Sequence, residues 1–346
     1  MNKRFAMKDF DSIKKIYEES SQAPGDTLAL YNRLWQLETW LREMVYVELR
    51  TFEKDWENYL PRAKGEYPRS KDKRLTHMAT AQESLLAYLT FSDLWNIILD
   101  DKLWDCFSLY FPPKDILKGK IEEMSQIRHR VAHFRMPHQD DLRRTELFLR
   151  DIDQALWKFC TSYNKAFPVP LSENNPLVTR FSRVDQFPFL ELYPAGAAGP
   201  RSSNAVLSVT IERSIRPWVN LGTLNRPPVS EAGMIYHVLI FALDQRTMKY
   251  KEILQFTKEV HKNCIHIILG SLGESLTLTF PSILPIEIIS ETVEEFLRIT
   301  HSALWRFKSD EVEAVKVAAE WPEYVLPPTN PLAFLCSDMP CSFFGV

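Results

Sequence analysis

An arginine and a histidine near the end of one helical segment carry the most specific chemical signal in this sequence. In IRHRVAHFR, residues 127–135, four residues separate Arg128 from His133. Arginine presents a planar fork of donors that suits a phosphate, and histidine titrates near neutrality. Cleavage of RNA without a metal needs a base for the 2′-hydroxyl and a cation for the charge growing on the phosphorus. We therefore expect Arg128 and His133 to be catalytic.

The spacing of this pair bears on how a site could form. On a helix the two residues lie about 140° apart and roughly 7 Å apart along the axis, so they do not share one face. A second copy of the chain, related by a two-fold axis, could bring both pairs to one cleft. The sequence thus predicts a homodimer. Candidates for its interface, each of which could equally be core, are Trp95, Ile98, Trp104 and Phe134.

The same segment allows other interpretations. Arg128 could pair with Glu123 or Asp140, and a lone histidine near a helix end is commonly a cap or a packed side chain. His129 and His133 are four residues apart, as two metal ligands on a helix would be, but no HExxH motif or third ligand stands nearby. We therefore expect neither a metal nor a cofactor, and we assign His129 a supporting role.

Three further residues could support the catalytic pair Arg128 and His133. Arg135 follows Arg128 by seven residues and could contact RNA phosphate if the helix continues that far. Glu38 and Arg42 form an i,i+4 pair on the first long helix. This pair is either part of the site or a solvated ion pair.

A basic stretch at residues 61–77 offers a second contact for RNA. The net charge of −3 gives no global attraction to nucleic acid, so binding would depend on a local patch. We expect Lys71, Lys73 and Arg74 to bind RNA, and a solvated loop is the alternative.

Composition is that of an ordinary globular protein, with 45% hydrophobic and 25% charged residues. The five cysteines are scattered, which indicates neither a disulfide framework nor a zinc site. Residues 1–15 contain no apolar run long enough for a signal peptide or a membrane span. We therefore expect a cytoplasmic protein with no membrane partner.

Helical periodicity dominates the first half of the chain and predicts an all-α bundle over residues 1–168. Ser92-Asp93 can cap the third of its helices. The expected helices cover about 27–57, 76–89, 90–99, 113–132 and 140–167.

Residues 169–180 are polar and interrupted by prolines, which suits a linker. Residues 181–346 then combine β-rich segments, a hairpin around 271–273 and two helices, which predicts a smaller α+β domain. Residues 194–203 are expected to form a loop. Because this domain has no P-loop or nucleophile elbow, we interpret it as a sensor, a partner-binding surface or a dimerisation module.

The motif and its setting resemble the HEPN ribonuclease family over roughly residues 1–166. That family's motif is an arginine, a polar residue and a histidine after four to six intervening residues, which Arg128, His129 and His133 match. The order of the surrounding segments is also similar, namely LETWLREMVYVELR, LTFSDLWNIIL, DKLWDCFSLYF and LRRTELFLRDIDQALWKF.

This resemblance implies a homodimeric, metal-independent endoribonuclease of bacterial antiviral defence by abortive infection, or of a toxin-antitoxin system. An antitoxin or a phage-derived trigger would then control it. In some members a tyrosine two residues beyond the histidine is modified by a nucleotidyltransferase antitoxin, but Arg135 stands at that position here. The alternative is a non-catalytic HEPN-like module that binds RNA or a nucleotide.

Overall fold

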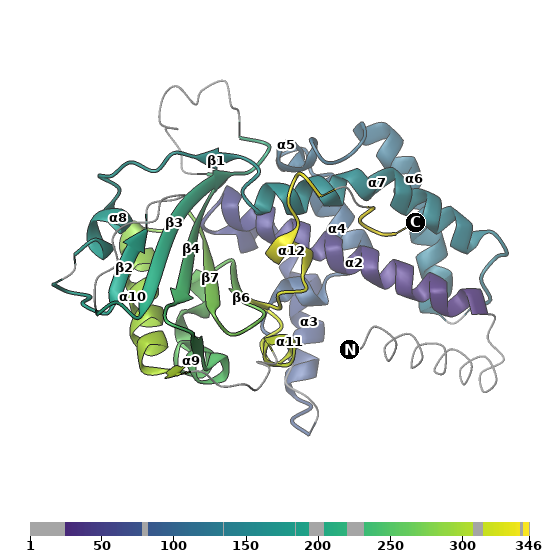
Figure 1. The fold of residues 1–346 in the computed structure, drawn as a ribbon. Helices are drawn as coiled ribbons and strands as arrows, with labels where there is room; N and C mark the ends of the chain where they lie inside the picture. Colours follow the sequence, from purple (N-terminus) through teal and green to yellow (C-terminus); the bar gives the residue numbers. More distant parts are fainter. Residues whose placement is uncertain are drawn as a thin grey trace.

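The computed structural model describes residues 25–77, 82–133, 135–183, 185–193, 204–219, 232–306, 314–339 and 342–345. A helical N-terminal region is followed by a region built on a β-sheet, and the two pack side by side (Figure 1). The predicted mixture of a helical first part and a sheet-containing second part is therefore confirmed. The loop expected over 194–203 and Phe134 lie outside the described residues.

The helical region is organised around the long helix α2 (Gly25–Phe52). Its buried leucines at positions 30, 34, 37 and 41 recur every three or four residues and form one apolar stripe. The other helical elements of this region are η1 (Trp56–Tyr59), α3 (Arg62–Lys73), η2 (Leu85–Tyr88), α4 (Phe91–Ile98), α5 (Trp104–Phe107), α6 (Lys114–Ala132) and α7 (Asp141–Tyr163). None of the helices in the described part of the chain is long and apolar enough to cross a membrane.

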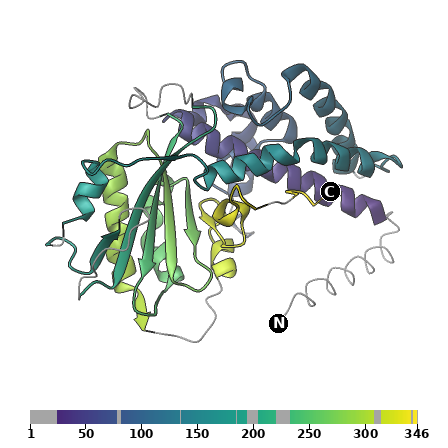
Figure 2. The same cartoon turned by 45° about the horizontal axis from the view of Figure 1, so that its top comes forward.

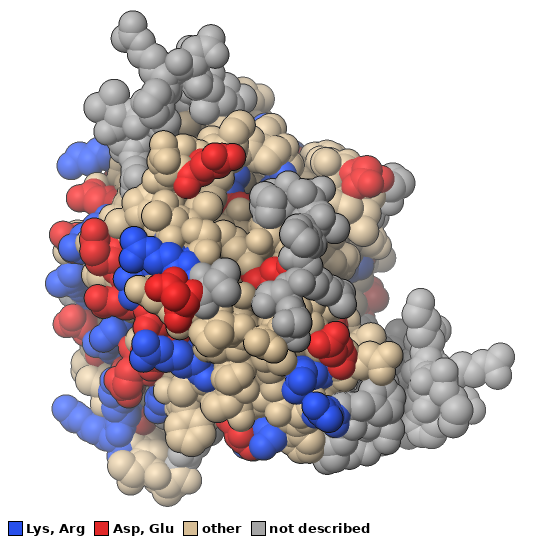
Figure 3. Space-filling model, turned by 60° about the vertical axis from the view of Figure 1, so that its left-hand side comes forward, with Lys and Arg blue, Asp and Glu red and all other residues tan. Residues whose placement is uncertain are grey.

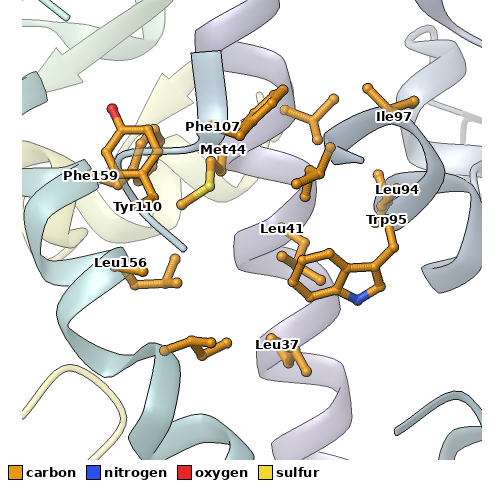
Figure 4. Close-up of a cluster of buried hydrophobic side chains, with 14 of the residues drawn as sticks. Leu37, Leu41, Met44, Leu94, Trp95, Ile97, Phe107, Tyr110, Leu156 and Phe159 are labelled. Carbon is orange, nitrogen blue, oxygen red and sulfur yellow. The ribbon is translucent and has the colours of Figure 1, made fainter. Parts of the chain in front are cut away.

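Trp95 of α4 lies in the middle of the helical core. Its side chain is 1% exposed, and its ring lies 5.4 to 6.2 Å from the rings of Phe91, Phe111 and Phe148. Figure 4 shows it facing the leucines of α2. Ile98 is buried in the same core. The expectation that Trp95 and Ile98 belong to a dimer interface is therefore wrong, because core packing already uses both side chains.

The basic stretch that could have been a loop forms helix α3. Gly65 allows α3 to approach η2 closely, because a Cβ there would lie only 3.2 Å from the carbonyl oxygen of Leu85. Lys64 Nζ lies 2.6 Å from the Asp93 carboxylate of α4. These contacts hold the segment against the bundle, so the solvated loop is not what forms.

The chain between α3 and α4 forms a shorter element than its pattern predicts. Among the described residues, the helix expected over 76–89 is reduced to the single turn η2. The N-cap of α4 is Thr90, not Ser92. The Thr90 hydroxyl accepts from the Asp93 N–H, and the Asp93 carboxylate accepts from the Thr90 N–H. This capping box starts α4 where the expected helix begins.

Within the described residues, the main sheet of the second region has seven strands. Their order is β1-β3-β4-β7-β6-β9, with β2 parallel to β3 at one side. Antiparallel pairing of β6 with β7 confirms the predicted hairpin. The strands are β1 (Pro168–Val169), β2 (Leu190–Tyr193), β3 (Leu207–Ile215), β4 (Met234–Ala242), β6 (His266–Leu269), β7 (Ser275–Pro281) and β9 (Val325–Leu326), and β5 (Arg246–Met248) pairs with β8 (Leu304–Arg306).

Alternate residues of the strands face opposite sides of the sheet. Tyr236 and Val238 of β4 pack in a second core with the helices beyond the sheet. Their neighbours Ile235 and His237 face the helical region, where the His237 ring lies 6.0 Å from that of Tyr163. The sheet is therefore a layer between the two sets of helices (Figure 2). The helices of this region are α8 (Pro176–Phe181), α9 (Tyr250–Phe256), η4 (Lys258–Asn263), α10 (Ile286–Ser302), α11 (Ala314–Ala319) and α12 (Pro331–Phe334).

The segment expected to be a linker is part of the second region. Strand β1 pairs with β3, and Asn175 caps α8 by accepting from the Leu177 N–H at 3.0 Å. Leu177 and Phe181 are buried in the core of that region. Prolines interrupt this segment without leaving it unstructured, because Pro176 occupies the first turn of α8, where no N–H is needed.

The C-terminal part of the described chain returns to the helical region. Asp153 of α7 accepts from the Ser342 hydroxyl and from the N–H groups of Phe343 and Phe344 at 2.8 to 3.0 Å. Arg33 of α2 donates to the Phe344 carbonyl at 2.8 Å. Apolar side chains of the same segment complete the helical core, namely Leu332, Leu335 and Phe344. The two predicted domains therefore share a core at this point.

A buried ion pair joins the two regions. Glu48 of α2 and Arg216, which follows β3, are fully buried, and Arg216 Nη2 lies 2.5 Å from Glu48 Oε1. Tyr110 and Trp218 donate to the same carboxylate at 2.7 Å. Burial alone would lower the pKa of the Arg216 guanidinium, but the Glu48 charge raises it above its usual value. The Arg216 guanidinium therefore stays charged in the interior.

Candidate functional site

The predicted motif lies at the C-terminal end of α6. The helix ends at Ala132, and His133 is its C-cap, with its N–H donating to the His129 carbonyl at 3.2 Å. The Arg135 N–H donates to the Arg130 carbonyl at 2.9 Å, beyond the end of the helix. The helix therefore ends before Arg135, and the condition under which Arg135 would share the face of Arg128 is not met.

Arg128 points toward α2 and meets the supporting pair expected there. Its Nη2 lies 3.5 Å from Glu38 Oε2, while Arg42 Nη2 lies 2.9 Å from Glu38 Oε1. Arg42 also donates to the carbonyls of Leu86 and Leu89 at 3.0 and 3.1 Å. The structure thus brings Arg128, Glu38 and Arg42 together, with Glu38 between the two guanidinium groups. We call these three residues the arginine cluster.

Among the described residues, Arg128 forms neither of its alternative ion pairs. Glu123 contacts Arg144 of α7 instead. Asp140 precedes α7 as its N-cap residue and forms no ion pair with Arg128 in the part of the chain that the structure describes. Arg128 therefore faces the first long helix, as a supporting role of Glu38 and Arg42 requires.

A cavity of about 260 Å³ lies beside the arginine cluster. The Arg128 side chain is 34% exposed there, and its 3.5 Å contact with Glu38 leaves guanidinium donors available to an anion. Charge-assisted hydrogen bonds from arginine to phosphate are among the strongest that proteins form. The cavity walls combine these charges with aromatic rings, and include Tyr31, Trp35, Glu38, Arg42 and Arg128.

The two histidines of the motif lie together on the exposed side of the helix end. The rings of His129 and His133 are 4.4 Å apart in an edge-on arrangement. Partial desolvation, followed by the charges of His133 and Arg135, lowers the pKa of His129. Neither ring lines the 260 Å³ cavity that Arg128 lines. Within one chain, therefore, the structure does not bring Arg128 and His133 to the same cavity.

These histidines form no metal centre with other described residues. No group of three or more His, Cys, Asp or Glu side chains suited to a metal ion occurs in the part of the chain that the structure describes. A pair of histidines would fill two of the four positions of a tetrahedral zinc ion and leave the other two to further ligands.

The basic side chains expected to bind RNA lie at the end of α3. Lys71 Nζ lies 4.5 Å from the centre of the Tyr67 ring, and Lys73 Nζ lies 2.6 Å from Glu83. Arg74 follows the helix as an exposed C-cap residue. Elsewhere, on the left-hand side of the molecule, described Lys and Arg side chains are interspersed with Asp and Glu (Figure 3). The basic stretch on α3 is thus a local feature, partly neutralised by Glu83.

A larger cavity of about 610 Å³ lies between α2 and the second region, and the sequence interpretation missed it. It shares Trp35, Thr39 and Arg42 with the smaller cavity. The sequence feature that could have indicated this cavity is a row of polar and aromatic residues along α2, on the side away from the leucine stripe. Its walls also include Glu43, Tyr46, Arg50, Lys262 and Tyr324.

A chain of buried polar groups leads from this larger cavity into the interface between the regions. Glu43 Oε1 lies 2.8 Å from His266 Nε2, and His266 Nδ1 lies 2.9 Å from the Tyr163 hydroxyl. That hydroxyl also lies 2.7 Å from Thr279 Oγ1. Burial raises the pKa of Tyr163 well above its usual value, so the phenol stays protonated. These polar contacts hold the Glu43 side chain at the wall of the larger cavity.

No protein-family model matches this chain, and no characterised relative or solved structure matches it either.

Proposed function

We propose that this chain is a metal-independent endoribonuclease of the HEPN type. The observation that supports this most directly is the arginine cluster, in which Arg128 of the motif meets Glu38 and Arg42 beside a 260 Å³ cavity. Such a cluster presents fixed cationic donors to a phosphate, and preorganised donors are an effective source of transition-state stabilisation. We place the enzyme in the bacterial cytoplasm, in antiviral defence by abortive infection or in a toxin-antitoxin system.

The reaction begins with attack of the RNA 2′-hydroxyl on the adjacent phosphorus. His133 takes the proton of that hydroxyl, and Arg128 stabilises the charge on the phosphate oxygens. The bond from phosphorus to the 5′-oxygen breaks, and a second histidine returns a proton to that oxygen. The products carry a 2′,3′-cyclic phosphate and a 5′-hydroxyl, and DNA is resistant because it lacks the nucleophile.

A homodimer is part of this proposal. His133 lies outside the cavity that Arg128 lines, so a partner subunit must supply the complementary group for both to meet one phosphate. Trp104, half-buried at the surface of the helical core, stays a candidate for the interface. An antitoxin or a phage-derived trigger acting through the second region is the class of regulator that this proposal implies.

The test is RNA cleavage in the presence of EDTA by the wild type, by His133→Ala and by the matched control His138→Ala. His138 is an exposed histidine five residues further on and takes no part in the arginine cluster. We expect cleavage to survive EDTA, to be lost in His133→Ala and to persist in His138→Ala. Equal activity of all three proteins would overturn the assignment.

A second experiment tests the dimer. Excess His133→Ala protein is mixed with wild type to form hybrid dimers, and specific activity is followed over a dilution series with light scattering. We expect activity to fall with both dilution and added variant. A monomer with undiminished activity would contradict the composite site while leaving the ribonuclease assignment standing.

The second candidate function is a non-catalytic module that binds RNA or a nucleotide. It is favoured by the separation of Arg128 and His133 in one chain, because the arginine cluster binds an anion without needing the histidine. Binding without cleavage by the wild type, at any protein concentration, would select this function.

A further inference from the structure

One face of α2 runs along both cavities. Trp35, Thr39, Arg42, Tyr46 and Arg50 follow one another at intervals of three or four residues and all line the 610 Å³ cavity. At 1.5 Å per residue, this face extends about 22 Å from Trp35 to Arg50. The two cavities share its first half, so they form one elongated groove beside α2. We call it the α2 groove.

The far end of the α2 groove carries cationic groups that the arginine cluster does not use. Arg50 Nη2 donates to the carbonyls of Lys262 and Cys264 at 2.7 and 3.1 Å. Arg50 Nε is buried without a hydrogen-bond partner among the described residues. Within the same described set, neither Arg50 nor Lys262 forms an ion pair. Arg50 and Lys262 both line the larger cavity, so two cationic residues border the space in which we place a phosphate.

The near end of the groove exposes large aromatic rings. Trp35 is 62% exposed and Tyr31 is 54% exposed, although both belong to a helix that is otherwise well packed. Tyr324, from the second region, lies across the larger cavity from α2. Exposed rings beside cationic side chains are typical of surfaces that stack the bases of a single strand.

The carboxylates of the groove are mostly occupied. Glu38 lies between the two guanidinium groups of the arginine cluster, and Glu43 contacts His266. Glu83 contacts Lys73, and Glu323 accepts from backbone N–H groups at the start of η2. Glu57, exposed to solvent, is the remaining lining carboxylate. The groove therefore repels an anion less than its composition alone indicates.

From these observations we infer that the α2 groove binds a single-stranded nucleotide chain, with a base stacked on Trp35 and a phosphate held by Arg50 and Lys262. The end of the groove at Arg50 and Lys262 lies beyond the motif, so it extends the contact with RNA away from the arginine cluster. This inference rests on the proposed function for the identity of RNA as the strand. A free nucleotide carries the same groups but is too short to reach from Trp35 to Arg50, about 22 Å along α2, and the test separates the two sources.

The test measures binding apart from cleavage. A fluorescently labelled 2′-O-methyl RNA oligonucleotide lacks the nucleophile, so its anisotropy reports affinity whether or not the chain is a nuclease. Unlabelled adenosine monophosphate is the competing probe. The variants are Trp35→Ala and Lys262→Ala, both at exposed positions, and the matched controls are Phe256→Ala and Lys251→Ala, which line neither cavity.

We expect Trp35→Ala to weaken binding about five- to 100-fold, as the loss of one stacked base does. We expect Lys262→Ala to reduce the slope of log affinity against log salt by about 0.7. The controls should bind like the wild type. Competition by adenosine monophosphate in the micromolar range would identify a free nucleotide as the occupant, and binding of the oligonucleotide alone would identify a strand.

Unchanged affinity and salt slope in both variants would overturn the inference, even if the wild type cleaves RNA. Conversely, the wild type could fail to cleave RNA while both variants lose binding. That result would support the α2 groove as a binding site and reject the proposed ribonuclease activity. The two failures are therefore distinguishable.

Discussion

Two glutamates of α2 each meet an arginine from another part of the chain, but they do so in opposite surroundings. Glu48 and Arg216 are fully buried, and Tyr110 and Trp218 add donors to the same carboxylate. Glu38 is partly exposed and divides its oxygens between two arginines, with Arg128 only loosely held at 3.5 Å. The buried pair satisfies its groups within the protein, whereas the exposed cluster leaves donors for a ligand. The same residue types thus serve cohesion in one place and recognition in the other.

The largest expected effect tests the buried pair. Glu48→Gln removes the charge that compensates the buried Arg216 guanidinium, so it should lower the free energy of unfolding by about 3–5 kcal/mol. Urea denaturation followed by tryptophan fluorescence measures this, with Glu53→Gln, an exposed glutamate just after the end of α2, as the control. A loss below about 1 kcal/mol would mean that the pair does not hold the two regions together.

The second effect tests recognition at the exposed cluster. Arg128→Ala and His133→Ala should each cost on the order of 3 kcal/mol or more of transition-state stabilisation in RNA cleavage, while the unfolding free energy stays unchanged. The double variant should be little worse than either single one, because the two groups act in one step. Rate constants from single-turnover cleavage provide the measurement, and small, additive losses would assign both residues to structure.

A smaller effect concerns the basic end of α3. Neutral replacements of Lys71 and Arg74 should weaken RNA binding for all sequences alike and reduce the salt slope by about 0.7 each. Lys73→Gln should do less, because Glu83 already neutralises Lys73. Binding titrations of two unrelated oligonucleotides at several salt concentrations compare the three variants. A loss confined to one oligonucleotide would indicate base recognition instead.

The smallest effect concerns Glu38, the partly exposed glutamate. Glu38→Gln should change the unfolding free energy by less than about 1 kcal/mol, since exposed ion pairs contribute little. It should at the same time strengthen binding of inorganic phosphate, because Arg42 and Arg128 lose their shared counter-charge. Isothermal titration with phosphate tests this, with Glu122→Gln on α6 as the control. Weaker phosphate binding would show that Glu38 orients the arginines more than it neutralises them.

Local patterns predicted those elements whose cause is local. The apolar spacing of α2 and the hairpin of β6 and β7 follow from periods of 3.6 and 2 residues, and both are present as expected. Glu38 and Arg42 could be paired from their spacing on one helix. The contact of Arg128 with Glu38 was not predicted, because no local spacing relates α6 to α2.

Contacts between distant segments had no such signal. Glu48 and Arg216 are 168 residues apart, and no periodicity connects a helix residue to a residue after a strand. The helix α3 was open to a loop interpretation because its stabilising contacts, Lys64 with Asp93 and Gly65 against Leu85, come from later parts of the chain. The α2 groove was missed for the same reason, since Lys262 and Tyr324 of the second region form part of its walls.

The return of the chain to Asp153 has a consequence for synthesis on the ribosome. Phe344 follows Asp153 by 191 residues, and its ring belongs to the core that α2 and α7 build. At a synthesis rate of 5–20 residues per second, α7 emerges about 10 to 40 s before the segment that completes its packing. During that interval the helical region exposes apolar surface that Leu332, Leu335 and Phe344 later cover. The final packing of the first region thus follows the synthesis of a segment that lies 191 residues further along the chain.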